Sequence, residues 1–504
     1  MSSEKQIRME RRELLLQRGV ELYPYYFKTN SSIREIKQNF NELEQSDEEV
    51  SLAGRVISLR GHGKTMFLDL MNDHEKIQLY FKSEQMDEDC FKLAKKIDIG
   101  DFIGVSGKVM KTKTGEVTLR VLKWMFLSKS LMSLPEKFHG LKDPEIRYRQ
   151  RYLDFIANPS STQKMIIRSK IIKEIRNFLD ERGFIEIETP ILQPIYGGAF
   201  AEPFSTHYNS LDREFFLRVS NELYLKRLLI GGFNQIYEFA KDFRNEGMDK
   251  DHNPEFTQVE VYQAYVDYYA MMELTEQMFR QLALKIHQSL QINYAGHILD
   301  FSQSWNRISF IDEINRVVGE SVKGKTSNQL EKIAEKFNID CPDDISGGKI
   351  LDLLFSNLIQ PDLIQPTFVM DHPLEISPLA KVHRHNPDLV ERFEPIIGGM
   401  EVGNAFSELN DPVEQRRRLE YQNKLRLEGG KENQPLDEDF LQAMSYGMPP
   451  AGGLGLGVDR IVMIFTDSDN IKEVLAFPHL KTLPKQDEEL MSDSNPDNNS
   501  PVSG

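Results

Sequence analysis

The chain of 504 residues holds 40% hydrophobic and 28% charged side chains, as expected of a globular protein with two or three domains. No stretch approaches the roughly 18 to 20 consecutive apolar residues that cross a bilayer, and the charged N-terminus lacks the apolar core of a signal peptide. The two cysteines, Cys90 and Cys341, exclude a disulfide scaffold and any CxxC zinc site. We therefore expect a cytoplasmic protein without a membrane partner.

A net charge of −16, taken over the whole chain, argues against binding to nucleic acid. The distribution of charge weakens this argument. Positions 1–150 hold 26 of the 62 basic residues and 23 of the 78 acidic residues. The remainder of the chain therefore holds 36 basic and 55 acidic residues. A balanced N-terminal part therefore precedes a strongly acidic part, and an RNA-binding surface is possible in the former.

The N-terminal part is predicted to contain a small β-barrel. Residues 1–48 are expected to form a helical extension, beginning with a basic helix over 4–18. Between 49 and 128 the pattern changes to five short strands punctuated by glycine, with a helical piece after the third. This order is typical of a Greek-key barrel of the OB type, although another small barrel or sandwich fits the same pattern.

The rest of the chain is predicted to form one larger domain. Residues 129–161 contain proline and glycine breaks and are predicted to be a linker. The domain itself, 162–483, mixes helices with alternating strands, so that the fold class is α+β. The last segment, 484–504, is rich in Asp, Asn, Ser and Pro and is predicted to be a disordered acidic tail.

Two predicted strands of the larger domain, in the segments 237–247 and 255–265, flank a polar loop and concentrate charged residues. Because side chains alternate along a strand, the polar residues of the first strand fall on one face. Those residues, with their counterparts of the second strand, are Glu238, Asp242, Arg244, Glu246, Phe256, Glu260 and Tyr262. The pair presents them to one cleft, or else is a surface hairpin with a solvated charged face.

A second segment, 392–411, carries spaced carboxylates. Asn404, Phe406 and Glu408 share a strand face, and Glu394 and Glu401 lie just upstream. Such carboxylates suit Mg²⁺, which proteins usually share with substrate phosphates. Glu401 has the opposite parity to Asn404, so a regular strand does not direct both into one site, and a bulge near the glycines is one way to bring them together.

A third segment, 449–466, places the glycines 453, 455 and 457 before a helical run that starts at Val458. Its GxGxG spacing differs from the GxGxxG of dinucleotide-binding loops, and no Lys-Ser/Thr pair closes a phosphate loop. A helix N-terminus with Arg460 in its first turn suits a phosphate or the face of an adenine.

Together these segments resemble the signature motifs of the class II aminoacyl-tRNA synthetases. GFIEIETPIL (183–192) is similar to motif 1, FRNEG and HNPEF to motif 2, and GLGLGVDR to motif 3. RVSNELYLKRLLIGG, PLEISPLA and NAFSELND resemble the lysine-specific branch of the class. The resemblance covers nearly the whole chain.

The resemblance implies an enzyme that activates L-lysine with ATP and transfers it to the 3′ end of tRNA(Lys), releasing AMP and diphosphate. Arg244 and Arg460 are then the catalytic side chains, and Glu394 and Glu401 hold Mg²⁺. The residues implied around ATP are Arg244, Asn245, Glu246, His252, Asn253, Phe256, Glu394, Glu401, Val402, Gly457 and Arg460. Those implied around lysine are Gly198, Glu222, Glu260, Tyr262, Asn404, Phe406 and Glu408.

The resemblance also implies that the OB-type barrel reads the anticodon through Arg60, Phe67 and Gln78, with uridines stacked on Phe67. The alternative for Phe67 is a place in the barrel core. Motif 1 supports the dimer interface in the family, so a homodimer is expected.

Two positions depart from the family pattern. Asp251 and Glu202 stand where many relatives carry a basic residue. An anion beside ATP phosphates is unfavourable, so we expect Asp251 to point outward. A class II enzyme of another specificity, for aspartate or asparagine or for a lysine of a protein, shares all three motifs. A non-catalytic regulatory or RNA-binding relative is the other alternative, but such a relative normally lacks motif residues that are present here.

Overall fold

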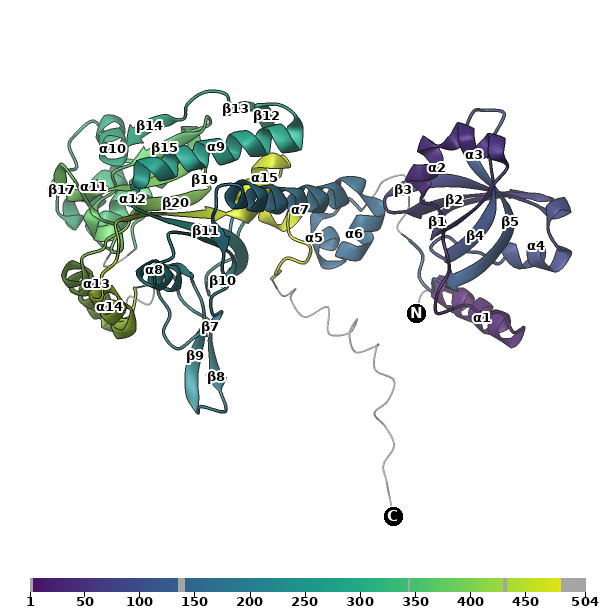
Figure 1. Ribbon diagram of the computed structural model, residues 1–504, viewed down its shortest axis with the longest axis horizontal. Coiled ribbons are helices and arrows are strands. Elements are labelled where there is room, and N and C mark those ends of the chain that lie inside the picture. Colours follow the sequence, from purple (N-terminus) through teal and green to yellow (C-terminus); the bar gives the residue numbers. More distant parts are fainter. Residues whose placement is uncertain (1–2, 135–140, 343–344, 429–432, 482–504) are drawn as a thin grey trace, which may run out of the picture. The chain divides into compact units, whose positions relative to one another are not determined.

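The structure is a computed structural model that describes residues 3–134, 141–342, 345–428 and 433–481 (Figure 1). The predicted acidic tail lies outside these residues. The chain divides into two compact units, the first made of 1–147 with 152–159 and the second of 148–151 with 160–504. Within the described ranges, no helix combines the length and the apolar character that crossing a bilayer requires.

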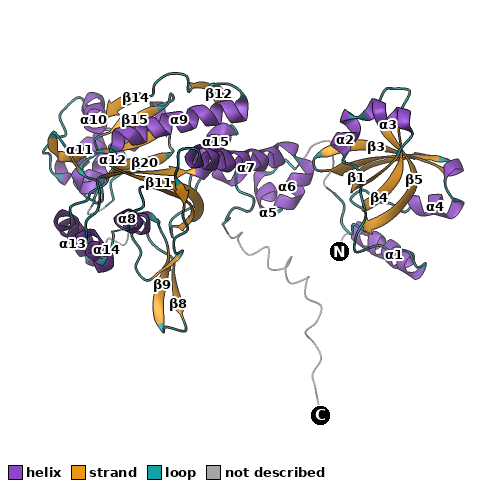
Figure 2. Ribbon diagram, viewed as in Figure 1, coloured by secondary structure: helices purple, strands orange, loops and turns teal. Residues whose placement is uncertain are grey.

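The first unit is a closed five-stranded barrel with the strand order β1-β2-β3-β5-β4, which confirms the predicted OB-type fold (Figure 2). Alternating residues such as Leu68 and Leu70 fill its core, and Leu15 of the N-terminal helix packs into the same core. The helical extension therefore belongs to the barrel unit. The elements are α1 (Ser3–Gln17), α2 (Ile33–Gln38), α3 (Phe40–Ser46), β1 (Glu49–His62), β2 (Thr65–Asn72), β3 (Glu75–Lys82), α4 (Glu88–Ala94), β4 (Phe102–Lys111) and β5 (Val117–Ser128).

The predicted linker is partly helical. Its second half forms the short helices α5 (Pro144–Arg149) and α6 (Arg151–Ala157), and α7 (Pro159–Asp180) begins immediately after them. Arg147 and Asp154 form an ion pair of 2.8 Å between the two short helices. Helices this short give little periodicity, which explains why the proline and glycine breaks dominated the prediction.

The second unit is built on a mostly antiparallel sheet with the order β14-β15-β18-β20-β21-β11-β10-β6, and β19 pairs with β18. Within the described part of this sheet, only the pairs β14–β15 and β10–β6 are parallel. The strands are β6 (Ile185–Glu186), β10 (Gln235–Phe243), β11 (Glu255–Ala264), β14 (Asn306–Ser309), β15 (Thr367–Met370), β18 (Arg392–Ile397), β19 (Met400–Glu401), β20 (Gly403–Ser407) and β21 (Ala451–Gly457).

Helices cover this sheet, and small sheets extend it. The helices are α8 (Glu222–Ile230), α9 (Tyr268–His287), α10 (Phe310–Val318), α11 (Ser327–Lys336), α12 (Gly347–Leu358), α13 (Pro412–Leu427), α14 (Glu438–Ser445) and α15 (Val458–Phe465). The small sheets contain β7 (Leu192–Gln193), β8 (Ser205–Tyr208), β9 (Arg213–Leu217), β12 (Gln291–Tyr294), β13 (His297–Asp300), β16 (Val382–His383) and β17 (Asn386–Val390).

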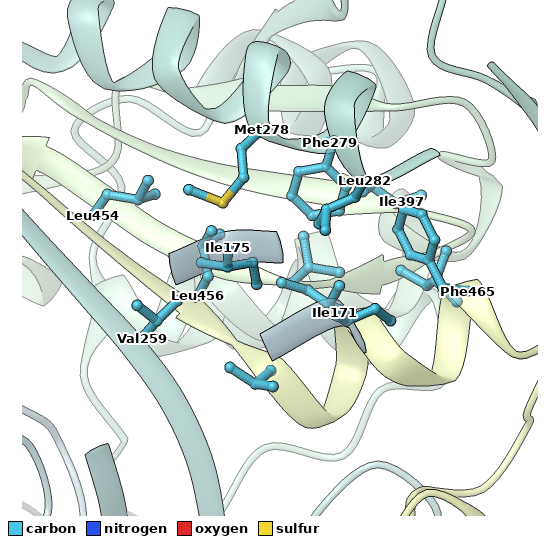
Figure 3. Close-up of a cluster of buried hydrophobic side chains, with 14 of the residues drawn as sticks. Ile171, Ile175, Val259, Met278, Phe279, Leu282, Ile397, Leu454, Leu456 and Phe465 are labelled. Atoms are coloured by element: carbon cyan, nitrogen blue, oxygen red, sulfur yellow. The ribbon is translucent and has the colours of Figure 1, made fainter. Parts of the chain in front are cut away.

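The two faces of the large sheet have different surroundings. On one face, α7, α9 and α15 pack Ile175, Phe279 and Phe465 against Val259 and Leu456 of the central strands (Figure 3). On the opposite face, α8 and α14 pack around Tyr262 and Phe406. Because strand residues alternate, this apolar packing turns Glu238 and Asp242 of β10 and Glu260 of β11 away from the first core.

Candidate active site

A cavity of about 1020 Å³ lies in the second unit, between the strands β11, β18, β20 and β21 and the helices α12 and α15. All the residues predicted around ATP and lysine line it, with one exception. Asn245 is exposed and is not part of the wall; its backbone N–H donates to the carbonyl of Glu202 at 2.8 Å. The structure therefore brings the two predicted sets of residues into one continuous space.

The β10–β11 hairpin places charged residues as the strand alternation predicted. Glu238 pairs with Glu260 and Asp242 with Phe256 across the two strands. Glu238, Asp242 and Glu260 are all buried, so the alternative of a solvated surface hairpin is wrong. Just beyond β10, the Arg244 guanidinium lies 5.0 Å from the centre of the Phe256 ring. The Arg244 cation and the Phe256 ring therefore lie side by side.

Arg460 joins the third segment to the polar loop of the hairpin. It lies in the first turn of α15, and Gly457 is the residue that precedes the helix. Its guanidinium donates to the Glu401 carbonyl at 2.7 Å and to Nε2 of His252 at 3.0 Å. On its other side, the His252 ring contacts the Asp249 carboxylate at 2.9 Å. A row of ionisable groups therefore runs along this wall of the cavity.

The predicted bulge is present. Gly398 and Gly399 form a turn at φ values of +60° and +75°. Beyond it, Ile396 pairs with Glu401 but Phe393 pairs with Ala405, so one extra residue separates β19 from β20. This register shift lets Glu401 and the later strand residues reach the same cavity.

Glu394 and Glu401 are close enough to influence each other's charge. Burial alone raises the pKa of Glu394, but His372 and Arg392 together bring it down to about 2. Desolvation and the charge of Glu394 raise the pKa of Glu401. Nearby, desolvation and Glu394 also raise the pKa of Asp352 to about 6. Asp352, on α12, was missed because nothing in the sequence connects it with this segment.

The carboxylates predicted around lysine converge in one part of the cavity wall. Glu260 accepts hydrogen bonds from Ser220 Oγ at 3.0 Å, Gln258 Nε2 at 2.8 Å and Tyr262 Oη at 2.8 Å. Burial raises the pKa of Glu260 to about 8, with Glu222 and Asp242 adding to the effect. Burial also raises the pKa values of Glu222 and Glu408. The region is dense in acidic groups and shielded from water.

Two glycines make room for these carboxylates. A Cβ on Gly453 of β21 would lie 1.9 Å from Oε1 of Glu408 and 2.7 Å from the Tyr262 ring. Gly198 has φ +92°, and a Cβ there would meet Ser220 Oγ at 2.9 Å and Glu222 Cβ at 3.1 Å. Gly453, the first glycine of the GxGxG run, therefore leaves room for the Glu408 side chain of the protein itself, in addition to any ligand.

The positions that depart from the family pattern lie close to the site. Contrary to our expectation, Asp251 lines the cavity, and its carboxylate lies 3.9 Å from the Lys250 ammonium. The neighbouring lysine offsets the negative charge at this position. The carbonyl of Glu202, as noted, accepts the backbone hydrogen bond of Asn245.

In the barrel unit, Arg60, Phe67 and Gln78 share one face. Arg60 pairs with Phe67 across β1 and β2, and the next strand pair places Gln78 opposite Asp69. Phe67 alternates with the core residues Met66 and Leu68 and is half-buried, so the alternative of a core position is wrong. Its ring stacks on Tyr80 with centroids 4.8 Å apart, which adds an aromatic residue that the sequence interpretation missed.

Comparison with known families agrees with this geometry. The family described as tRNA synthetases class II (D, K and N) matches residues 143–481, and the OB-fold nucleic acid binding domain matches 50–127. The first match covers more than half of the chain, so the chain belongs to the class II tRNA synthetases of this group.

Comparison with individual proteins is more specific than the match to the family. The chain is 49% identical to a lysine–tRNA ligase of Thermoanaerobacter pseudethanolicus, over 95% of this chain and 96% of the relative. It is 48% identical to one of Methanoculleus marisnigri, over 94% of each protein. It is 46% identical to one of Moorella thermoacetica, over 95% of this chain and 98% of the relative. All three relatives bear the name lysine–tRNA ligase.

Proposed function

We propose that this chain is a lysine–tRNA ligase, which forms lysyl-adenylate from L-lysine and ATP and then transfers lysine to the 3′ end of tRNA(Lys). One observation carries the proposal. A single cavity is lined both by Arg244 and Arg460 and by the buried carboxylates of Glu222, Glu260 and Glu408. The two arginines suit an anionic triphosphate and the carboxylates a diamino acid. The lysine–tRNA ligases that match the full chain support the same conclusion.

In the activation step, an oxygen of the lysine carboxylate attacks the α-phosphorus of ATP. The bond from that phosphorus to the oxygen bridging to the β-phosphate breaks, and diphosphate leaves. Both reactants are anions, so charge neutralisation and alignment are the main requirements. Arg244 binds the α-phosphate, and the Phe256 ring beside it lies under the adenine. Arg460 covers the other adenine face and contacts the γ-phosphate with His252.

Smaller contacts complete the ATP end. Glu246 lies at the mouth of the cavity, where it accepts from the adenine amino group. Asn253 supports the outer phosphates, and Val402 and Gly457 bring backbone close to the nucleotide. The geometry does not support a contact between Asn245 and ATP, because this residue does not line the cavity and its backbone N–H donates to the Glu202 carbonyl.

Glu394 and Glu401 hold Mg²⁺ in this proposal. Carboxylate oxygens are the ligands that Mg²⁺ prefers, and it takes the remaining ones from water and phosphates. No group of three or more His, Cys, Asp or Glu side chains in the described ranges is arranged as a metal site made of protein alone. A site with two protein carboxylates, in which substrate oxygens supply further ligands, agrees with that finding. When bound, the ion neutralises charge on the phosphates and the leaving diphosphate.

The acidic end selects the amino acid. Glu222, Glu260 and Glu408 pair with the two ammonium groups of lysine, while Tyr262, Asn404 and Phe406 shape the pocket and Gly198 lets the ligand approach. An amino acid without the ε-ammonium leaves a buried carboxylate unpaired and is rejected. An aspartate-specific site instead requires cationic side chains at this end, which argues against the D branch of the family.

The transfer step uses tRNA bound by both units. A hydroxyl of the terminal ribose attacks the lysyl carbonyl, and AMP leaves as the new ester forms. Arg60, Phe67 and Gln78 contact the anticodon, with bases stacking on Phe67. We further propose a homodimer, a cytoplasmic location and the domain boundaries 1–48, 49–128, 129–161, 162–483 and 484–504.

The test is ATP–diphosphate exchange with each amino acid in turn. We expect exchange that depends on L-lysine and on Mg²⁺. Exchange with aspartate or asparagine and none with lysine would contradict the proposal.

A further inference from the structure

A buried lysine lies directly behind the acidic pocket. Lys226 of α8 is completely buried, and it does not line the cavity. Its ammonium is 2.6 Å from Oε1 of Glu222, one helical turn earlier, and forms a second ion pair with Glu408 at the end of β20. It also lies 5.2 Å from the centre of the Phe406 ring. Lys226 therefore contacts three side chains of the proposed lysine pocket and none of the cavity space.

The ammonium is charged in this position. Burial lowers the pKa of Lys226, but Glu222 and Glu408 more than reverse this effect and raise the pKa above its ordinary value. Burying a charged group is unfavourable unless partners satisfy it. Here the helix spacing of Glu222 and Lys226 supplies one partner, and the convergence of α8 with β20 supplies the other. The three groups thus form a fixed cluster that joins two elements of the pocket.

The number of charges in the pocket makes this lysine relevant to specificity. The pocket has three carboxylates, and L-lysine carries two ammonium groups. The substrate's own carboxylate faces Arg244, at the other end of the site. Arg392 also acts on Glu222, but its guanidinium donates to Glu394 at 2.6 Å. Without a further cation, one acidic charge would therefore be in excess in a space shielded from water. The Lys226 ammonium removes this excess, because it is shared between Glu222 and Glu408.

We propose that Lys226 is a positioning residue for lysine recognition, which fixes the carboxylates of Glu222 and Glu408 and cancels one of the three negative charges of the pocket. This inference rests on the proposed function. Lys226 touches neither substrate, and it acts only through the two glutamates. Its loss leaves two like charges close together, free to separate or to take up a proton, so that the pocket no longer offers two fixed anions to a diammonium ligand.

The neighbouring Arg227 provides a matched control. It is also a largely buried cation of α8, but its partners are Asp437 at 2.9 Å and Asp439 at 3.0 Å. None of these three residues lines the cavity. An Arg227→Gln substitution therefore breaks ion pairs of the same helix without touching the pocket.

The test compares Lys226→Met, Lys226→Gln and Arg227→Gln in the full-length protein, by steady-state ATP–diphosphate exchange after folding is checked by thermal unfolding. Gln keeps most of the length and a hydrogen-bond donor, so it is the variant to use where Met prevents folding. For Lys226→Gln we expect KM for lysine to rise about ten- to a hundredfold. KM for ATP stays within about twofold, and Arg227→Gln changes neither value by more than this. An unchanged KM for lysine, or an equal rise for both substrates, overturns the inference.

A double-mutant cycle with Glu408→Gln identifies the route of the effect. Because Lys226 acts through that carboxylate, the double variant should raise KM for lysine far less than the product of the two single effects. Simple multiplication of the effects also overturns the inference. The proposed function fails in a different way, since the unsubstituted protein would then show no lysine-dependent exchange.

Discussion

Arg460 donates a hydrogen bond to Nε2 of His252 over 3.0 Å, although 208 positions separate the two residues in the chain. The contact ties the glycine-rich third segment to the loop of the β10–β11 hairpin, on the wall where we place the outer phosphates of ATP. It also fixes the proton on His252. Since Arg460 can only donate, Nε2 must accept, and Nδ1 then carries its proton toward Asp249.

Substitution of Asp249 should weaken ATP use. The carboxylate orients His252, but both side chains are more than half exposed, so the effect is modest. We expect Asp249→Asn to raise KM for ATP about two- to fivefold without changing KM for lysine. Steady-state exchange at varied ATP measures this directly.

Asp251→Asn, two residues further on, is the matched comparison. Asp251 lines the cavity, and its charge opposes that of the phosphates, so we expect its neutralisation to lower KM for ATP or leave it unchanged. A rise like that of Asp249→Asn would mean that Asp251 contributes to ATP binding.

Substitutions in the two units should affect different steps, adenylate formation in one case and the use of tRNA in the other. Arg244→Ala removes the cation beside Phe256, and we expect adenylate formation to fall about a hundredfold or more. Phe67→Ala removes one stacking ring in the barrel and should lower kcat/KM for tRNA about ten- to a hundredfold, with ATP–diphosphate exchange unchanged. Equal losses of exchange in the two variants would contradict this division of roles.

Lysine binding should release a proton near neutral pH. The pKa of Glu260 is raised to about 8, so the free protein holds this group protonated at pH 7, and the three carboxylates of the pocket are all charged only once lysine is bound. An incoming ammonium requires the carboxylate, so affinity for lysine is full above about pH 8 and weakens as pH falls, by up to about tenfold per unit. Calorimetric titration in two buffers of different ionisation enthalpy measures the released proton. The same heat in both buffers would contradict the raised pKa.

Gly453 should tolerate no side chain. The Cβ of Gly453→Ala would lie 1.9 Å from Oε1 of Glu408 and 2.7 Å from the Tyr262 ring, so both must move. We expect the free energy of unfolding to fall by about 1–3 kcal/mol, with a large rise in KM for lysine.

The control for this substitution is Gly455→Ala, whose Cβ meets nothing closer than 3.7 Å. We expect its free energy of unfolding to stay within about 0.5 kcal/mol of the original, as measured by urea denaturation. Equal destabilisation of the two variants would show that the glycine strand tolerates no methyl group anywhere.

The sequence predicted the elements in which local pattern and tertiary contact agree. Strand alternation placed Glu238 and Asp242 on one face of their strand, and both are buried beside Glu260. A bulge was one way to resolve the parity conflict at Glu401, and the structure has one between β19 and β20. In each case the period of the strand carries the information.

What the sequence did not reveal depends on contacts between distant elements. Lys226 lies in an ordinary amphipathic helix, where a lysine is expected on the exposed face. Only the meeting of α8 with Glu408 shows that it is buried. Asp352 reaches the carboxylates Glu394 and Glu401 from α12, which no motif marks. Asp251 was expected to point outward because of its charge, but it lines the cavity, with the Lys250 ammonium 3.9 Å from its carboxylate.

The most direct test of the central claim uses a stable mimic of the adenylate, in which a sulfamoyl group joins L-lysine to adenosine. If one cavity holds both halves, calorimetry should show the mimic binding at least about a hundredfold more tightly than L-lysine alone, and far more tightly than the aspartyl counterpart. Affinity no greater than that of the separate parts, or equal binding of the aspartyl mimic, would contradict the account.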